Sequence, residues 1–150
     1  MVLRFSSDAT EMSAELVHSY LVRSYWSEGI TLEVVDAAMR NSVCFAMFDG
    51  SDQVGFGRFI TDKSTFAYLA DVFILEEYQG RGVGKDMMEH AFRMPEVQGL
   101  RRMLLATAGA HGLYKKFGFD ELERPETMME KSDLDIYLKR QGGVNEKSID

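Results

Sequence analysis

Cysteine is scarce in this sequence, which contains a single one, Cys44. One cysteine cannot form a disulfide within the chain, and it has no second thiol with which to bind zinc. The three histidines, His18, His90 and His111, do not have the spacing of metal ligands. We therefore expect a protein of the reducing cytoplasm that binds no metal.

Long apolar runs and an excess of positive charge are also missing. No run approaches the roughly 20 apolar residues of a membrane-spanning helix, and the first residues, MVLRFSSDAT, lack the apolar core of a secretory signal. The net charge is -7, whereas binding to nucleic acid requires a basic surface. We expect neither a membrane nor a nucleic acid as partner. The acidic surface either attracts a cationic acceptor such as an amine or simply keeps the protein soluble.

The composition is that of one ordinary globular domain. Apolar residues make up 45% and charged residues 27% of the 150 positions, which is close to the globular average and enough for a buried core. No repeat or low-complexity tract interrupts residues 1–139, which we expect to form a single domain. Residues 140–150, RQGGVNEKSID, are polar and contain glycine, and this composition predicts a flexible tail.

Hydrophobic periodicity predicts an alternation of strands and helices in the order β-α-α-β-β-β-α-β-α-β. Asp8 or Thr10 would cap the first helix and Thr31 the second. The predicted strands are 2–5, 42–48, 54–61, 64–75, 101–107 and 134–140, and the predicted helices are 8–26, 31–41, 83–94 and 109–119. Hairpin strands that lead into strand–helix–strand units predict an α/β (α+β) fold with a mixed sheet and helices on its faces.

The most informative segment is the turn YQGRGVGKD, residues 78–86, between a predicted strand and a predicted helix. A Walker loop would need glycine at Gln79 and serine or threonine at Asp86. A Rossmann fingerprint would need glycine at Lys85. Neither template fits, which leaves the pattern Gln79-x-x-Gly82-x-Gly84.

This pattern suits a bulky anion such as a diphosphate. Gly82 and Gly84 lack Cβ, so backbone N–H groups can converge on the anion. The positive end of the following helix points to the same place, and Arg81 and Lys85 add full charges. The alternative is a glycine-rich turn that binds nothing.

Two segments together resemble the GNAT superfamily of N-acetyltransferases. Residues 79–84, Gln-Gly-Arg-Gly-Val-Gly, match its (Gln/Arg)-x-x-Gly-x-(Gly/Ala) signature, and residues 71–91 resemble its strand–loop–helix core. Residues 112–119, GLYKKFGF, resemble its late helix. The resemblance extends more loosely over residues 2–138.

The resemblance implies a GNAT-like, mostly antiparallel sheet of about six to seven strands, flanked by about four helices, with splayed fourth and fifth strands. Acetyl-CoA would lie in the splay. By similarity its contacts are Val72, Phe73, Ile74, Gln79, Gly80, Arg81, Gly82, Val83, Gly84, Lys85 and Thr107. Thr107 stands where the family often has an asparagine.

The resemblance also places Tyr114 where the family's general acid protonates the departing thiolate. A phenol with a pKa of about 10 can donate that proton. From the residues alone, without the resemblance, the pattern favours Tyr114 as a core residue beside Leu113 and Phe117. Asp71 is the sole ionised group in FAYLADVFIL, so it is either the base or the partner of an arginine or a helix end. Arg102 stands where some relatives carry a glutamate, which excludes that route. His111 and a water chain are the remaining alternatives for the base.

The acceptor would bind beside the segment RSYWSEGI, residues 23–30. Tyr25, Trp26 and Glu28 either form an aromatic slot with an acidic tip for a cation, or pack as an ordinary loop. His111, one helical turn before Tyr114, either contributes to this site or faces solvent.

We therefore expect an acetyl-CoA-dependent N-acetyltransferase that acts directly on a primary amine of a small molecule or peptide. Cys44 is predicted to be a core residue, so no acetyl-enzyme is expected. A module that binds CoA without turnover and an enzyme with a longer acyl donor are the alternatives. An exposed late strand would also allow a homodimer.

Overall fold

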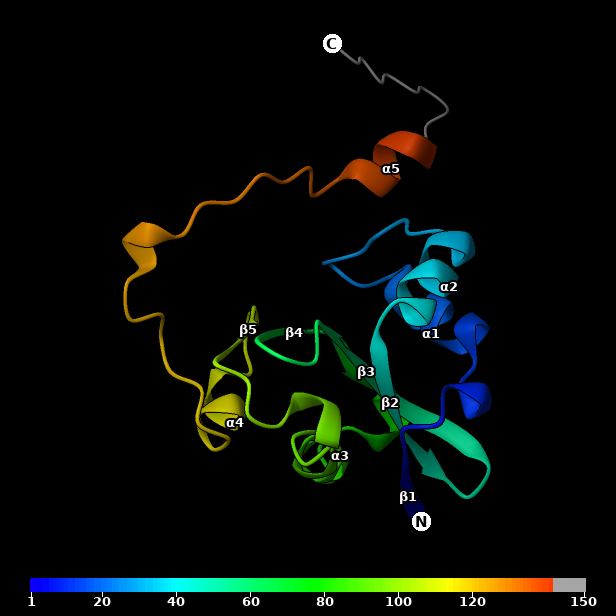
Figure 1. Cartoon of the computed structure of the whole chain (residues 1–150). Helices are drawn as coiled ribbons and strands as arrows, with labels where there is room; N and C mark the ends of the chain where they lie inside the picture. The colour runs from blue at the N-terminus through cyan, green and yellow to red at the C-terminus, as the bar shows by residue number, and fades with distance from the viewer. Residues whose placement is uncertain (142–150) are drawn as a thin grey trace.

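The structure, a computed structural model, describes residues 1–141 (Figure 1). The chain forms five strands and five α-helices, with short 3₁₀ turns between them. In chain order these elements are β1 (Leu3–Ser6), α1 (Ala14–Leu21), α2 (Leu32–Arg40), β2 (Val43–Asp49), β3 (Asp52–Thr61), β4 (Phe66–Ile74), α3 (Val83–Ala91), β5 (Arg102–Leu105), α4 (His111–Lys115) and α5 (Ile136–Gln141).

The strands form one mixed sheet in the order β1-β2-β3-β4-β5. Neighbouring strands are antiparallel except β4 and β5, which are parallel and joined through α3. Helices α1 and α2 lie on one side of the sheet and α3 and α4 on the other (Figure 1). The predicted mixed, mostly antiparallel sheet with helices on its faces is confirmed.

The predicted strand count of six to seven is wrong for the described residues, which contain five strands. Residues 134–140 are predicted as a strand, but residues 136–140 instead form most of helix α5, and residues 134 and 135 form the turn before it. Short apolar runs fit either a helix or a strand, and tertiary contacts decide between them. In α5, Tyr137 packs against the α1–α2 side of the core, and Gln141, one turn later, donates a hydrogen bond to Gly29 O at 2.8 Å.

Helix α5 also corrects part of the predicted tail, because residues 140 and 141 are helical. The rest of that tail, residues 142–150, lies outside the described residues. At the other end of the chain, Asp8 caps the 3₁₀ turn Ala9–Glu11, whereas Ser13 caps α1 through Leu16 N. Thr31 caps α2, as predicted.

Two apolar clusters hold the helices on the sheet. Phe45 belongs to the cluster under α3, and its neighbour Cys44 belongs to the cluster under α1 and α2, as expected for side chains that alternate along a strand. Helix α3 contributes buried residues to the first of these clusters, namely Val83, Met87, Met88 and Ala91. The helix start at Val83 is therefore fixed against the sheet, and with it the glycine turn.

Gly57 lets the sheet pack tightly, since a Cβ at this position would overlap the ring of Phe45. We expect Gly57→Ala to destabilise the fold by about 1–3 kcal/mol through overpacking. Gly112→Ala is the matched control, because it adds its methyl group in a helix with nothing within 4 Å, and it should leave the stability unchanged or raised. Thermal unfolding followed by circular dichroism tests both. Equal melting temperatures would contradict the close packing at Gly57.

Candidate functional site

Strand β4 is paired with β5 over only part of its length. The parallel pairing runs from Phe66 to Leu69, whereas β4 continues to Ile74. No other strand within residues 1–141 takes up that edge of β4 beyond Leu69. This is the arrangement expected of splayed strands. An extended ligand can hydrogen-bond along such an edge as an added strand would.

The backbone of β4 presents alternate residues to this edge. Leu75 N–H donates to Val54 O of β3 at 2.9 Å. Phe73, two positions earlier, therefore also points its backbone groups toward β3, and Ile74 points its own to the open edge. The predicted cofactor contact thus fits Ile74, whereas the backbone of Phe73 is directed to its neighbouring strand.

Asp71 lies at an irregularity in β4 next to Val72. The β3–β4 register shifts before Arg58, and Asp71 has a φ of 57°. A left-handed conformation costs a non-glycine residue roughly 1–2 kcal/mol, so the contacts of the side chain must hold it. Asp71 Oδ2 accepts a hydrogen bond from Arg58 Nε at 2.8 Å, and Oδ1 accepts one from Trp26 Nε1 at 2.9 Å.

The Arg58–Asp71 ion pair is largely removed from solvent, with side chains only 16% and 12% exposed. Arg58 also donates to Ser42 Oγ at 2.9 Å. The pair lines a small cavity of about 70 Å³ between α1, α2 and the sheet, which Tyr137 of α5 also lines. Of the two alternatives for Asp71, the structure shows a carboxylate paired with an arginine. Its role as the base stays a prediction.

The glycine turn has the conformation that its sequence predicts. Gly80 and Gly82 have φ values of 73° and 80°, and nothing lies within 4 Å of where their Cβ atoms would be. Gly82 is the N-cap residue of α3, and because glycine has no side chain, no side-chain hydrogen bond caps this end of the helix. Because the first amides of a helix lack intrahelical acceptors, the N–H groups of residues 82–85 are available to an anion in the open space beside them.

The side chains of the turn stabilise it through hydrogen bonds and a cation–π contact. Gln79 Nε2 donates to Ile74 O at 2.8 Å, which ties the turn to the open edge of β4. Arg81 lies over the ring of Tyr78 at 5.4 Å and donates to Glu77 O at 3.2 Å. Tyr78 in turn donates to Asp49 Oδ2 at 2.8 Å. Lys85 and Arg81 remain on the exposed or partly exposed surface of the turn.

Tyr114 lies on α4 and is 7% exposed. Burial raises the pKa of its phenol above the ordinary value, and its ring packs edge-on against Phe119 with centroids 5.9 Å apart. A pocket of about 520 Å³ is lined by Tyr114, Thr107 and His111. Thr107 Oγ1 accepts a hydrogen bond from Ala110 N at 3.0 Å, so this hydroxyl also shapes the start of α4.

The predicted acceptor residues lie on the loop between α1 and α2. Trp26 is 38% exposed and Tyr25 74% exposed, and their rings meet edge to face at 5.0 Å. Glu28 is exposed on the same loop. The hydrogen bond from Trp26 to Asp71 brings this loop to β4, so the structure joins the acceptor residues to the candidate base.

Sequence reasoning missed three residues of this site: Arg58, Ser42 and Tyr137. Arg58 could have been found, because it is a lone charge in the apolar strand VGFGRFIT, the same signal that singled out Asp71. Ser42 and Tyr137 carry no such signal, since only the tertiary fold brings them to the ion pair.

The chain is similar to known proteins in both sequence and fold. The family model of the acetyltransferase (GNAT) domain matches residues 40–121. The chain belongs to the GNAT acetyltransferase family. A protein of Gibberella zeae, named as a candidate acetyltransferase, is 30% identical over 134 residues, which is 74% of this chain and 75% of that protein.

Solved structures agree with the GNAT assignment. A candidate GNAT acetyltransferase from Xanthomonas campestris pv. campestris is 40% identical, with a TM-score of 0.88, over 91% of this chain and 97% of its own. A predicted acetyltransferase from Clostridium acetobutylicum, solved with acetyl-CoA, shares the fold at 15% identity and a TM-score of 0.62, over 87% of this chain and 96% of its own. Membership of the GNAT family implies acetyl transfer from an acyl-CoA.

Other kinds of site find no support in the part of the chain that the structure describes. Residues 1–141 contain no group of three or more histidine, cysteine or acidic side chains placed to hold a metal ion. Among the same residues, no helix has both the length and the apolar character to cross a membrane.

At Gly82 the turn requires a left-handed backbone conformation, which favours glycine over other residues. We expect Gly82→Ala to lower the stability by roughly 1–2 kcal/mol, because alanine is strained at this φ, and to weaken CoA binding. Gly84→Ala is the matched control, since its Cβ would make an ordinary 3.5 Å contact with Ile74. Melting curves with and without CoA measure both effects. Equal behaviour of the two variants would refute a conformational requirement at Gly82.

We expect a large loss of stability when the mostly buried Arg58–Asp71 pair is broken. Asp71→Ala leaves the arginine charge without its partner in a mostly buried site, and we expect a loss of about 3 kcal/mol or more. The exposed pair Arg40–Asp36, with side chains 66% and 53% exposed, provides the control, and Asp36→Ala should cost under about 1 kcal/mol. Denaturant unfolding compares them. A loss at Asp71 as small as that at Asp36 would show that the pair is not a structural anchor.

Proposed function

We propose that this protein is a cytoplasmic, acetyl-CoA-dependent N-acetyltransferase that passes the acetyl group directly to a primary amine of a small molecule or peptide. The observation that carries the proposal is the open edge of β4, which leads through Ile74 and Gln79 into the glycine turn at the start of α3. The edge suits an extended amide-containing arm, and the turn suits a diphosphate.

The residues present fit this donor. Ile74 offers backbone groups along the edge beside the register shift at Asp71 and Val72, and the amides from Gly80 to Lys85 belong to a turn in which nothing lies within 4 Å of where Cβ atoms at Gly80 and Gly82 would be. These contacts involve the main chain, so they depend on the glycine conformations rather than on particular side chains. The donor supplies an activated thioester, whose carbonyl carbon accepts the amine nitrogen while its sulfur leaves.

Tyr114 would act as the general acid. Because burial raises the pKa of its phenol, the hydroxyl is protonated at neutral pH and has a proton to donate. The leaving thiolate has a conjugate thiol pKa of about 8.5, by analogy with cysteine, so a nearby phenol can transfer its proton to sulfur as the C–S bond breaks. The pocket beside Tyr114, which Leu105 and Phe119 also line, supports this role because it gives the phenol a space in which a thioester can lie.

The base that takes the proton of the amine is Asp71, His111 or water. Both Asp71 oxygens already accept a hydrogen bond, one of them from the Arg58 cation, but each oxygen has a second lone pair. Asp71 therefore also serves to hold the Trp26 loop against β4. Trp26, Tyr25 and Glu28 would bind the cationic acceptor, with the aromatic faces and the carboxylate attracting the ammonium group.

Thiol release from acetyl-CoA in the presence of an amine panel tests the proposal. We expect Tyr114→Phe to lower kcat by about 100-fold, with the KM for acetyl-CoA little changed, since a general acid contributes on this scale. Tyr20→Phe is the matched control, because Tyr20 packs by its ring on Phe73 at 4.1 Å, and phenylalanine keeps that contact.

Two outcomes would favour the alternatives. CoA binding without thiol release for any amine would indicate a module that binds the cofactor and does not turn over. Faster release from propionyl-CoA than from acetyl-CoA would indicate a longer acyl donor. Equal kcat for Tyr114→Phe and Tyr20→Phe would remove Tyr114 from the mechanism.

A further inference from the structure

Strand β5 ends the sheet with an open edge. It pairs with β4 on one side, and no strand within residues 1–141 pairs with its other side. Such an edge presents a row of backbone donors and acceptors to any extended chain that reaches it, and natural proteins usually cover or blunt it. Here the covering segment is not a strand.

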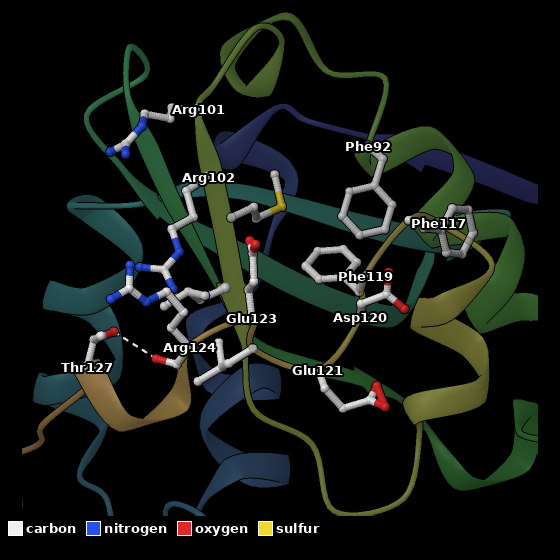
Figure 2. A pocket seen from close by; sticks show the side chains of 14 residues that line it. Phe92, Arg101, Arg102, Phe117, Phe119, Asp120, Glu121, Glu123, Arg124 and Thr127 are labelled. Atoms are coloured by element: carbon white, nitrogen blue, oxygen red, sulfur yellow. Dashed lines mark hydrogen bonds between the residues drawn. The ribbon is translucent and has the colours of Figure 1, made fainter.

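The space beside β5 is a trough between this strand and residues 117–127. Two pockets, of about 670 and 520 Å³, lie along this trough. Both are lined by Met103, Leu104 and the segment 119–122. Figure 2 shows Arg101 and Arg102 on one side of the first pocket and Asp120 and Glu121 on the other. The trough thus has an apolar floor and walls of opposite charge.

The arm that follows, residues 128–135, is the least covered part of the described chain. It forms neither helix nor strand, and every residue from 120 to 135 is exposed. Met129 is 96% exposed and Leu134 82% exposed. Large apolar side chains left in water forgo the free energy of burial, about 25 cal/mol for each Å² of apolar surface. The arm therefore has surface that a partner would cover.

Only the first residue of the arm contacts the trough of its own chain, since Arg102 lies 3.8 Å from the sulfur of Met128. The first end of the arm leaves the trough through the turn Pro125–Thr127, and its other end is held by α5, where Gln141 bonds to Gly29. Between these two anchors it runs around the outside of the domain (Figure 1). An extended arm of eight residues reaches roughly 26 Å at about 3.3 Å per residue, twice the length of a four-residue strand such as β5.

We propose that the occupant of the trough is the arm of a second copy of this chain, so that two copies exchange arms about a twofold axis. The arm would add an extended segment to the open edge of β5 and bury Met129 and Leu134. The charges agree with this pairing on one side of the trough: the arm carries Glu130, Asp133 and Asp135 against the single cation Lys131, and this net negative charge suits the side that carries Arg101 and Arg102. A twofold interface requires a surface that complements itself, and the arm and trough of one chain meet that requirement.

The proposal goes beyond acetyl transfer, and it has a consequence for the candidate site. The second pocket of the trough is also lined by Tyr114 and Thr107. The partner's arm would therefore form one wall of the space beside the proposed general acid.

The mass of the protein in solution tests the exchange without any acyl donor or acceptor. Light scattering after size-exclusion chromatography should give twice the chain mass of 17.0 kDa. The double variant Met129→Lys, Leu134→Lys should run as a monomer, because it places two charges where apolar contacts form. Val2→Lys, at a residue 72% exposed outside the arm, is the matched control and should stay dimeric.

Hydrogen exchange gives a second readout at the trough itself. The amides of residues 102–105 should exchange at least tenfold more slowly in the wild type than in the double variant, with circular dichroism showing that both are folded. A wild type that is monomeric at about 100 µM overturns the proposal. So does a dimer that persists in the double variant, or one that leaves exchange at β5 unchanged, because either result places the contact elsewhere.

Discussion

The arrangement of this protein depends on one constraint: β4 loses its neighbour β5 after Leu69 and continues to Ile74 paired only with β3. Parallel strands linked through a helix can separate in this way because no tight turn joins them. The free edge of β4 and the amino end of α3 then meet at the glycine turn, where Gln79 bonds back to Ile74. The turn and the edge that we propose to bind acetyl-CoA are thereby adjacent in the structure.

The buried pair Arg58–Asp71 connects this surface to the opposite face of the sheet. Asp71 adopts a costly backbone conformation within β4, and its side chain reaches the loop between α1 and α2 through Trp26. A charge pair of this kind contributes little net stability compared with apolar residues. What the pair does in this structure is positional, since Asp71 holds the Trp26 loop beside β4.

Two of the unpaired strand edges of this sheet, on β4 and on β5, suit different ligands. On β4 the open edge continues into the glycine turn, which suits a small extended ligand that ends in a diphosphate. On β5 the open edge borders a charged trough, which suits a polypeptide. The first follows from the short length of β5, four residues, which covers only the first part of β4. The second arises because no strand within residues 1–141 pairs with the outer side of β5.

The sequence by itself determined the features that depend on neighbours in the chain. The glycine turn, the Thr31 cap and the hairpin of β2 and β3 are local, because glycine conformation, capping and strand alternation act over a few residues. Only the tertiary structure decided that residues 136–141 are helical, that Ser13 caps α1, and that Arg58 and Trp26 hold Asp71. Each of these requires contacts between distant segments, such as Gln141 with Gly29. Neither an alternation of apolar residues nor a lone charged residue in the sequence indicates which distant segment it will contact.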